Sequence, residues 1–173
     1  MKLFPILLII LASLPPGTVG LSAWGQDGIN QNSPPSQKGI IGSTGNGPGE
    51  FHGPYSIAVD SSKNIFVADR GNNRIEKFST DGTILATWGT SGTGNGKFKA
   101  PTGVAVNSAG SIYVVDTGNI RIEKLDSNGG FVRTFGTFGT TNGQFVLPIG
   151  IATASSGSLY IADTGNNRIE VFS

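Results

Sequence analysis

The sequence predicts an all-β chain built from a repeated four-stranded antiparallel sheet, and three observations support this prediction. Glycine is abundant, with 27 among 173 residues, and turn-forming sequences separate short apolar segments over most of the chain. Asp69, Asp116 and Asp163 recur at intervals of 47 residues, and no insertion or deletion breaks this spacing. No segment keeps the 3.6-residue apolar period of a helix. A constant period in this range indicates a repeat architecture.

Each repeat contains four short apolar segments that we expect to be strands. In the middle repeat these are residues 103–106, 112–115, 121–125 and 131–135. The second segment is apolar on both faces and the third alternates between apolar and polar residues, which is typical of strands. Turn sequences such as Asn-Gly-Gly at residues 128–130 separate them. The repeats cover about residues 40–86, 87–133 and 134–173, and each contains a Gly-x-Phe-x-x-Pro motif.

The apolar faces of these sheets predict how the repeats pack together. A four-stranded sheet with two apolar faces cannot bury both by itself, so we expect the sheets to stack radially as blades of a β-propeller. The first strands carry small residues such as Ala58 and Ala105, which suit the crowded centre of a propeller. Larger residues such as Phe66 and Trp88 on the second and fourth strands would fill the wider outer space.

The turn between the second and third strands carries the most specific motif of the chain. It reads Asp-Arg-Gly-Asn-Asn-Arg-Ile at residues 69–75, Asp-Thr-Gly-Asn-Ile-Arg-Ile at 116–122 and Asp-Thr-Gly-Asn-Asn-Arg-Ile at 163–169. Together with Gly-x-Phe-x-x-Pro and Gly-Val-Ala-Val, this motif resembles the signature of NHL repeats over about residues 39–173. The resemblance implies a propeller, in most members with six blades, so three NHL-type blades would form half of a ring. It also implies protein or ligand binding, RNA binding or, in a few members, enzymatic activity.

The residue types of this signature suit a structural role. An Asp carboxylate can accept hydrogen bonds from backbone N–H groups of its own turn, and Gly and Asn tolerate the positive φ angles that such turns require. Arg can pair with a carboxylate or cover apolar surface with its stem. A metal site made of Asp and Asn is the alternative. The residues predicted to form this structural signature are Asp69, Asn72, Arg74, Asp116, Asn119, Arg121, Asp163, Asn166 and Arg168.

The third repeat reaches only its third strand, whereas residues 38–42 are in register with a fourth strand. One hypothesis is a homodimer that closes a six-bladed ring, in which residues 38–42 of each chain complete the third blade of the other. The other hypothesis is a fragment or truncated product, whose end blades would expose apolar faces.

Strand order also predicts where a binding site could lie. In an antiparallel blade, the loop from a fourth strand to the next first strand lies on the same rim as the turn between the second and third strands. A protein or small anionic ligand could bind cationic side chains there, although solvated loop charges would give the same pattern. His52, Arg70 and Ile120 break the repeat, which makes them more distinctive candidates. The possible rim-binding residues are His52, Arg70, Arg74, Lys97, Lys99, Arg121 and Arg168.

Composition excludes several classes of function. The chain has no Cys and one His, which excludes Cys nucleophiles, Cys-based zinc sites and three-histidine metal sites. Its net charge of +1 gives no reason to expect DNA binding. Residues 92–97 are Gly-rich but no Ser/Thr or helix follows, so they do not form a phosphate loop. We therefore predict a non-enzymatic binding module with no catalytic residue, metal or cofactor. The alternatives are a truncated remnant of a propeller hydrolase or lyase, or an intracellular NHL scaffold associated with ubiquitin ligation or RNA binding.

The amino terminus predicts export. Lys2 precedes about a dozen mostly apolar residues, and small residues follow, which is the pattern of a signal peptide over residues 1–23. The apolar segment is shorter than the roughly 20 residues that span a bilayer, so no stable membrane span is expected, with an uncleaved anchor as the alternative. Residues 24–38 are polar and rich in Gln, Asn, Ser and Pro, which predicts a flexible linker before the blades at 39–173.

Overall fold

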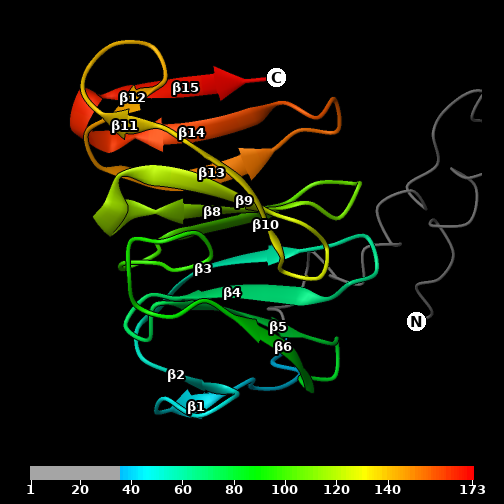
Figure 1. Ribbon diagram of the computed structural model, residues 1–173. Helices are drawn as coiled ribbons and strands as arrows, with labels where there is room; N and C mark the ends of the chain where they lie inside the picture. The colour runs from blue at the N-terminus through cyan, green and yellow to red at the C-terminus, as the bar shows by residue number, and fades with distance from the viewer. Residues whose placement is uncertain (1–35) are drawn as a thin grey trace, which may run out of the picture. The chain divides into compact units, whose positions relative to one another are not determined.

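The computed structural model describes residues 36–173, and the strands described there lie in one compact unit, Ile40–Ser173 (Figure 1). The predicted signal peptide, residues 1–23, and most of the predicted linker, residues 24–38, lie outside the described residues. Within 36–173, no helix is long and apolar enough to cross a membrane.

Three antiparallel sheets form the blades, and they are all-β apart from short 3-10 turns at Thr117–Asn119 and Thr164–Asn166. The first blade consists of β3 (Pro54–Val59), β4 (Ile65–Asp69), β5 (Arg74–Phe78) and β6 (Ile84–Trp88). The second blade consists of β7 (Gly103–Val106), β8 (Ile112–Asp116), β9 (Arg121–Leu125) and β10 (Phe131–Phe135). The third blade consists of β13 (Pro148–Thr153), β14 (Leu159–Asp163) and β15 (Arg168–Phe172).

The strand order confirms the predicted meander. Neighbours along the chain pair in the first blade as β3-β4-β5-β6 and in the second as β7-β8-β9-β10. The second strands of the first two blades, β4 and β8, are almost wholly buried, as their continuous apolar sequences predicted. Before the first and third blades, the chain forms short parallel pairs, β1 (Ser43–Thr44) with β2 (Glu50–Phe51) and β11 (Thr137–Phe138) with β12 (Gln144–Phe145).

The segment in register with a fourth strand, residues 38–42, forms no strand in this structure, and the third blade has three strands. A fourth strand needs the free edge of a three-stranded sheet as its partner. The free edge of the third blade belongs to β15, at the opposite end of the stack of blades.

The blades stack side by side, with their first strands innermost. β7 contacts both β3 and β13, and the three blades follow in order from β3–β6 to β13–β15 in Figure 1. One apolar core lies between the first and second blades and includes Phe66, Ile75 and Phe98. A second core lies between the second and third blades and includes Ile122 and Phe145. Apolar side chains from neighbouring sheets therefore bury each other, and the fold is a partial β-propeller of three blades.

Candidate functional site

One rim of the blades carries the signature motif, and we call it the corner rim. It consists of the corners, residues 69–74, 116–121 and 163–168, and the lead-in loops before each first strand, residues 45–53, 92–100 and 139–147. Backbone bonds join the two: the Gly71 amide donates to the His52 carbonyl at 2.7 Å and the Gly118 amide to the Lys99 carbonyl at 2.8 Å. The two kinds of loop thus share one rim, as the antiparallel strand order predicted.

The corner Asp is the centre of each hydrogen-bond network. Asp116 is fully buried; its Oδ1 accepts the backbone amide of Lys99 at 2.7 Å. Its Oδ2 accepts Asn119 Nδ2 and Arg121 Nε, both at 2.8 Å. Asp69 and Asp163 make the same three kinds of bond in their blades.

The prediction that this Asp caps its own turn was wrong. The Asp116 side chain makes no cap bond to the turn that follows it. The turn closes through its own backbone instead, because the Ile120 amide donates to the Thr117 carbonyl at 3.1 Å. The carboxylate is therefore free to hold a backbone amide 17 residues earlier in the chain. Besides holding Asn119 and Arg121 of its own corner, the Asp joins the corner to the lead-in loop, which is a tertiary role.

The corner Arg joins the same two segments from its other end. Arg121 Nη1 donates to the Thr93 carbonyl at 2.8 Å, and Nη2 donates to the carbonyls of Gly94 and Lys97 at 2.9 Å. Nη2 also lies 2.6 Å from Glu123 Oε1. Arg74 and Arg168 repeat this arrangement on their own lead-in loops. The predicted carboxylate pairing is confirmed, and the guanidinium groups already have protein partners.

The corner Gly is required for space and not for a positive φ. A Cβ atom at Gly118 would lie 2.6 Å from the Lys99 carbonyl oxygen, which is far inside contact distance. The left-handed conformation falls two residues later, at Asn73 (φ 55°), Ile120 (φ 54°) and Asn167 (φ 54°). The predicted positive φ at Gly was therefore wrong, whereas Asn does occupy such a position in two corners. Ile120 is a β-branched residue held where such residues are strained.

A Glu two residues after the corner Arg completes each network, and the sequence-based list of site residues missed it. Glu123 is fully buried and accepts the Gly96 amide at 3.0 Å, as Glu76 accepts the Gly49 amide at 3.1 Å. Burial raises the pKa of Glu123, opposed by the Arg121 charge and by the Gly96 hydrogen bond. The signal for these residues was present, because Glu recurs at the same 47-residue interval as the corner Asp.

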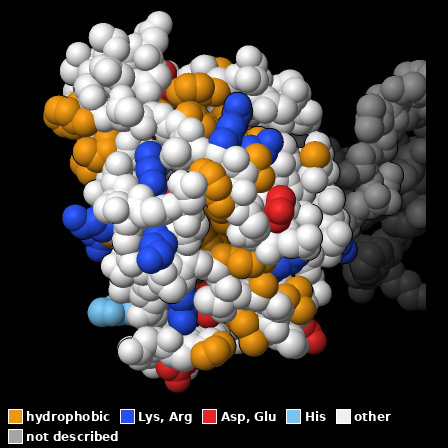
Figure 2. Space-filling view, viewed as in Figure 1, with side chains coloured by type: hydrophobic (Ala, Val, Ile, Leu, Met, Phe, Trp, Pro, Cys, Tyr) orange, Lys and Arg blue, Asp and Glu red, His pale blue; other side chains and the backbone are white. Residues whose placement is uncertain are grey.

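The seven predicted rim cations fall into two groups. Arg74, Arg121 and Arg168 belong to the networks described above. The other four side chains are exposed and make no ion pair with residues 36–173: His52, Arg70, Lys97 and Lys99. Figure 2 shows Lys and Arg side chains gathered along the left-hand side of the molecule, where the histidine also lies.

The carboxylates on the rim are not arranged as a metal site. Within residues 36–173, no group of three or more His, Cys, Asp or Glu side chains could hold a metal ion. The half-buried Glu50 of the first lead-in loop accepts the backbone amides of Asn46 and Gly47 at 3.1 and 2.9 Å. The rim therefore offers cationic side chains and ordered backbone loops as its available contacts.

Comparison with known proteins identifies relatives of these repeats. The NHL repeat family model matches residues 51–78, 98–125 and 145–172. NHL repeat-containing protein 3 of Homo sapiens is 44% identical over 50 residues, which are 28% of this chain and 14% of that protein. Protein lin-41 of Caenorhabditis elegans is 41% identical over 46 residues, 27% of this chain and 4% of that protein. The chain thus matches only a small part of these curated relatives.

Solved structures agree on the fold. A chain of the Nidogen/Laminin complex has a TM-score of 0.51 and 20% identity, with 68% of this chain and 47% of that chain covered. Virginiamycin B lyase from Staphylococcus aureus has a TM-score of 0.50 and 20% identity, with 69% and 40% covered. At these identities the likeness concerns the fold only. With three matched repeats, each holding the same Asp–Asn–Arg corner, the chain belongs to the NHL repeat family.

Proposed function

We propose that this chain is an exported, non-enzymatic propeller module that binds a protein or a small anionic ligand at the corner rim. One observation carries the proposal: four cationic side chains of the rim are exposed and have no ion-pair partner within residues 36–173. They are His52, Arg70, Lys97 and Lys99.

The corner networks support the view that their own side chains are structural and that the exposed cations bind. The carboxylates of Asp69 and Asp116 are fully buried and already hold backbone amides and arginines, so a ligand cannot reach them. The lead-in loop 92–100, which carries both Lys97 and Lys99, is held in place by the same bonds. Cations on ordered backbone lose less freedom on binding than cations on mobile loops.

The export part of the proposal rests on the amino-terminal sequence, and the non-enzymatic part rests on composition. Fractionation of the producing cells and the intact mass of the recovered protein test export, which requires the chain to leave the cytoplasm without residues 1–23. Metal analysis of the purified protein tests the lyase alternative. One equivalent of bound metal would favour a metal-dependent lyase over a non-enzymatic module.

Charge reversal tests the rim. The probes are a hexaglutamate peptide and inorganic phosphate, titrated at low salt and followed by NMR chemical shifts. We expect the double variant Arg70→Glu/Lys99→Glu to bind the peptide at least tenfold more weakly, with an affinity in the wild type that falls as salt rises. Lys63→Glu is the matched control, because Lys63 is an exposed cation in the turn between β3 and β4, on the opposite rim. Equal binding by the double variant and the control would refute the proposed site.

A further inference from the structure

The third blade exposes an apolar face whose counterparts in the other blades are buried. Ile169 on β15 is 60% exposed, whereas Ile75 and Ile122, at the same position of the repeat, are 0% exposed. Tyr160 on β14 is also exposed, although Phe66 at the equivalent position of the first blade is buried. The difference arises because the first and second blades each have a following blade packed against this face.

The first blade also exposes an apolar face, on the side that would pack against a preceding blade. Ile57 on β3 is 69% exposed, whereas Val104, its equivalent on β7, is 2% exposed because the first blade covers it. Phe51 is half-buried, whereas its equivalent Phe98 is fully buried in the same core. Within residues 36–173, no blade is therefore packed before the first blade or after the third.

The two internal cores show that these two free faces are complementary. Between the first and second blades, Ile75 and Phe66 from one face pack in the same core as Phe98 and Val104 from the other. The same pairing of positions recurs between the second and third blades. The free face of the third blade, which bears Ile169, thus has the residue positions that would cover the free face of the first blade.

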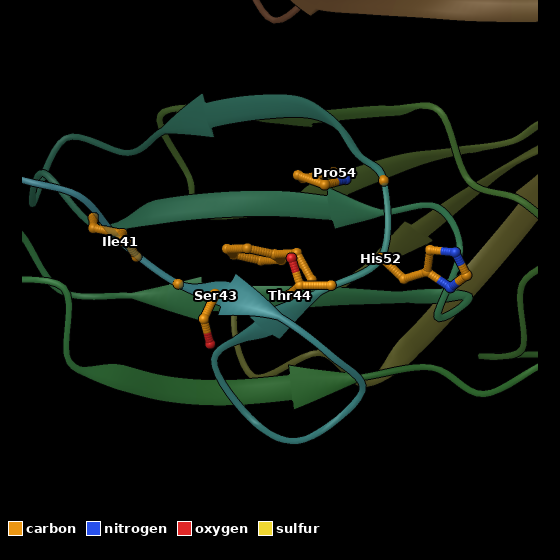
Figure 3. A pocket seen from close by; sticks show the side chains of 8 residues that line it. Ile41, Ser43, Thr44, His52 and Pro54 are labelled. Carbon is orange, nitrogen blue, oxygen red and sulfur yellow. The ribbon is translucent and has the colours of Figure 1, made fainter.

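A hollow on the first blade marks where that partner would sit. In Figure 3, Ile41, Ser43 and Thr44 lie along one side of it and Pro54 on the other, while the His52 ring points away. The half-buried Phe51 lines the same hollow. At the equivalent place on the second blade, side chains of the first blade cover Phe98. The hollow is therefore the vacant half of an interface between blades.

The free edge of β15 lacks a strand that the chain itself carries. At this edge of the other blades, Ile75 pairs with Trp88 of β6 and Ile122 pairs with Phe135 of β10. The position 47 residues before Trp88 is Ile41. A Cβ atom at Gly82 would lie 3.1 Å from Ile41 Cγ1, just as a Cβ at Gly129 would meet the Trp88 ring. Relative to the first blade, Ile41 thus already lies where a preceding blade's fourth strand ends.

We propose that a second copy of this chain fills both vacancies. The third blade of each copy packs on the first blade of the other. Residues 37–41 of each copy, which lie 47 residues before β6 (Ile84–Trp88) and refine the range 38–42 expected from the sequence, form the fourth strand of the other's third blade. The interface joins two different surfaces, so the copies form a closed ring only if the rotation from one copy to the next returns to the first copy. Three blades in each copy give six in the dimer. Closure by a twofold axis covers the free apolar faces of the first and third blades and pairs the free edge of β15 with a fourth strand.

The molecular mass of the full chain, expressed from its own amino terminus and purified, is the first test. We expect light scattering to give twice the mass of one chain at micromolar concentration. Ile169→Asp should give the mass of a single chain, because it places a charge in both interfaces. Val132→Asp is the matched control, since Val132 is an exposed apolar residue on β10, and it should remain dimeric. A wild-type protein with the mass of one chain, or one that forms open polymers, would overturn the proposal.

A disulfide trap tests the exchanged strand independently of any destabilised variant. The chain has no Cys, so a pair introduced by Gly39→Cys and Val171→Cys is the only one present. These positions are equivalent to the observed cross-strand pairs of Ala86 with Lys77 and Arg133 with Lys124. We expect a covalent dimer under oxidising conditions, and none from the control pair Gly39→Cys with Val132→Cys. A dimer by mass that this pair does not link would show another interface and overturn the exchange. Because both tests read assembly, their failure is distinguishable from failure of ligand binding at the corner rim.

Discussion

Asp116 is the residue whose replacement tests the corner network most sharply. Asn at this position has the same shape but no charge, and one acceptor oxygen becomes a donor amide. If its oxygen keeps the Lys99 amide, its NH₂ group faces Arg121 Nε and Asn119 Nδ2, which are both donors. Asp116→Asn therefore breaks two hydrogen bonds and leaves a donor against donors.

The expected loss of unfolding free energy follows from the burial of the Asp116–Arg121 ion pair. Removing one partner of a buried ion pair costs about 3–5 kcal/mol. The Arg121 side chain is 13% exposed and keeps its contact with Glu123, so we expect the lower end of that range, about 3 kcal/mol. Loss of a simple turn cap would cost only about 1 kcal/mol. Asp163→Asn should cost less than Asp116→Asn, because the Arg168 side chain is 28% exposed.

Urea unfolding at equal protein concentrations measures the loss. With a slope of about 2 kcal/mol per molar urea, a loss of about 3 kcal/mol lowers the midpoint by about 1.5 M. Hydrogen exchange should also quicken at the Lys99 amide, 17 residues before the substitution, because the neutral amide oxygen of Asn accepts a weaker hydrogen bond than the carboxylate does. The control is Asp126→Asn, because exposed Asp126 accepts only amides of its own turn, from Asn128 and Gly130. Equal losses in Asp116→Asn and Asp126→Asn, with unchanged exchange at Lys99, would refute the tertiary role of the corner Asp.

Three further predictions concern the same corners. Gly118→Ala should lower the free energy of unfolding by about 1–3 kcal/mol in a urea titration, because its Cβ would press on the Lys99 carbonyl; an unchanged midpoint would contradict the close approach. Asn73→Ile, which gives the first corner the residue of the second, should lower the free energy of unfolding by about 2 kcal/mol in the same assay. Ile is strained in the left-handed conformation at this position, and the Ala100 amide loses its hydrogen bond to Asn73 Oδ1 at 2.8 Å. Burial raises the pKa of Glu123, so its contribution to stability is present below the ordinary Glu pKa and is lost as pH rises through the raised folded-state pKa. The stability of the wild type relative to Glu123→Gln should therefore fall as pH rises above about 4, the ordinary pKa of Glu, and a constant difference would contradict the raised pKa.

The strands could be predicted from the sequence because their signals are local. Residues 112–115 are continuously apolar and became the buried central strand β8, and the 47-residue spacing gave the blades their order. The motif also located the corners. What it could not give was the set of partners, because the Asp116 carboxylate and the Arg121 guanidinium bind backbone groups 17 to 28 residues away.

The same limit applied to the candidate site. Sequence placed seven cations on one rim and assigned Arg74, but not Arg70, to the recurring signature. It could not show that distant carbonyls take the donors of Arg74 while Arg70 stays exposed. The role of Gly118 was equally hidden, since it depends on the approach of a carbonyl from another loop. Burial and tertiary partners, which only the folded chain defines, separated structural cations from available ones.

Arginine side-chain NMR most directly tests whether the corner arginines are structural while the neighbouring cations bind. Of the five arginines, Arg74, Arg121 and Arg168 donate Nε–H to buried carboxylates. We predict three slowly exchanging Nε–H signals that stay in place when hexaglutamate peptide is added, while the Arg70 signal moves. Rapid exchange at the three corner arginines, or peptide-induced shifts at them and not at Arg70, would contradict this separation of roles.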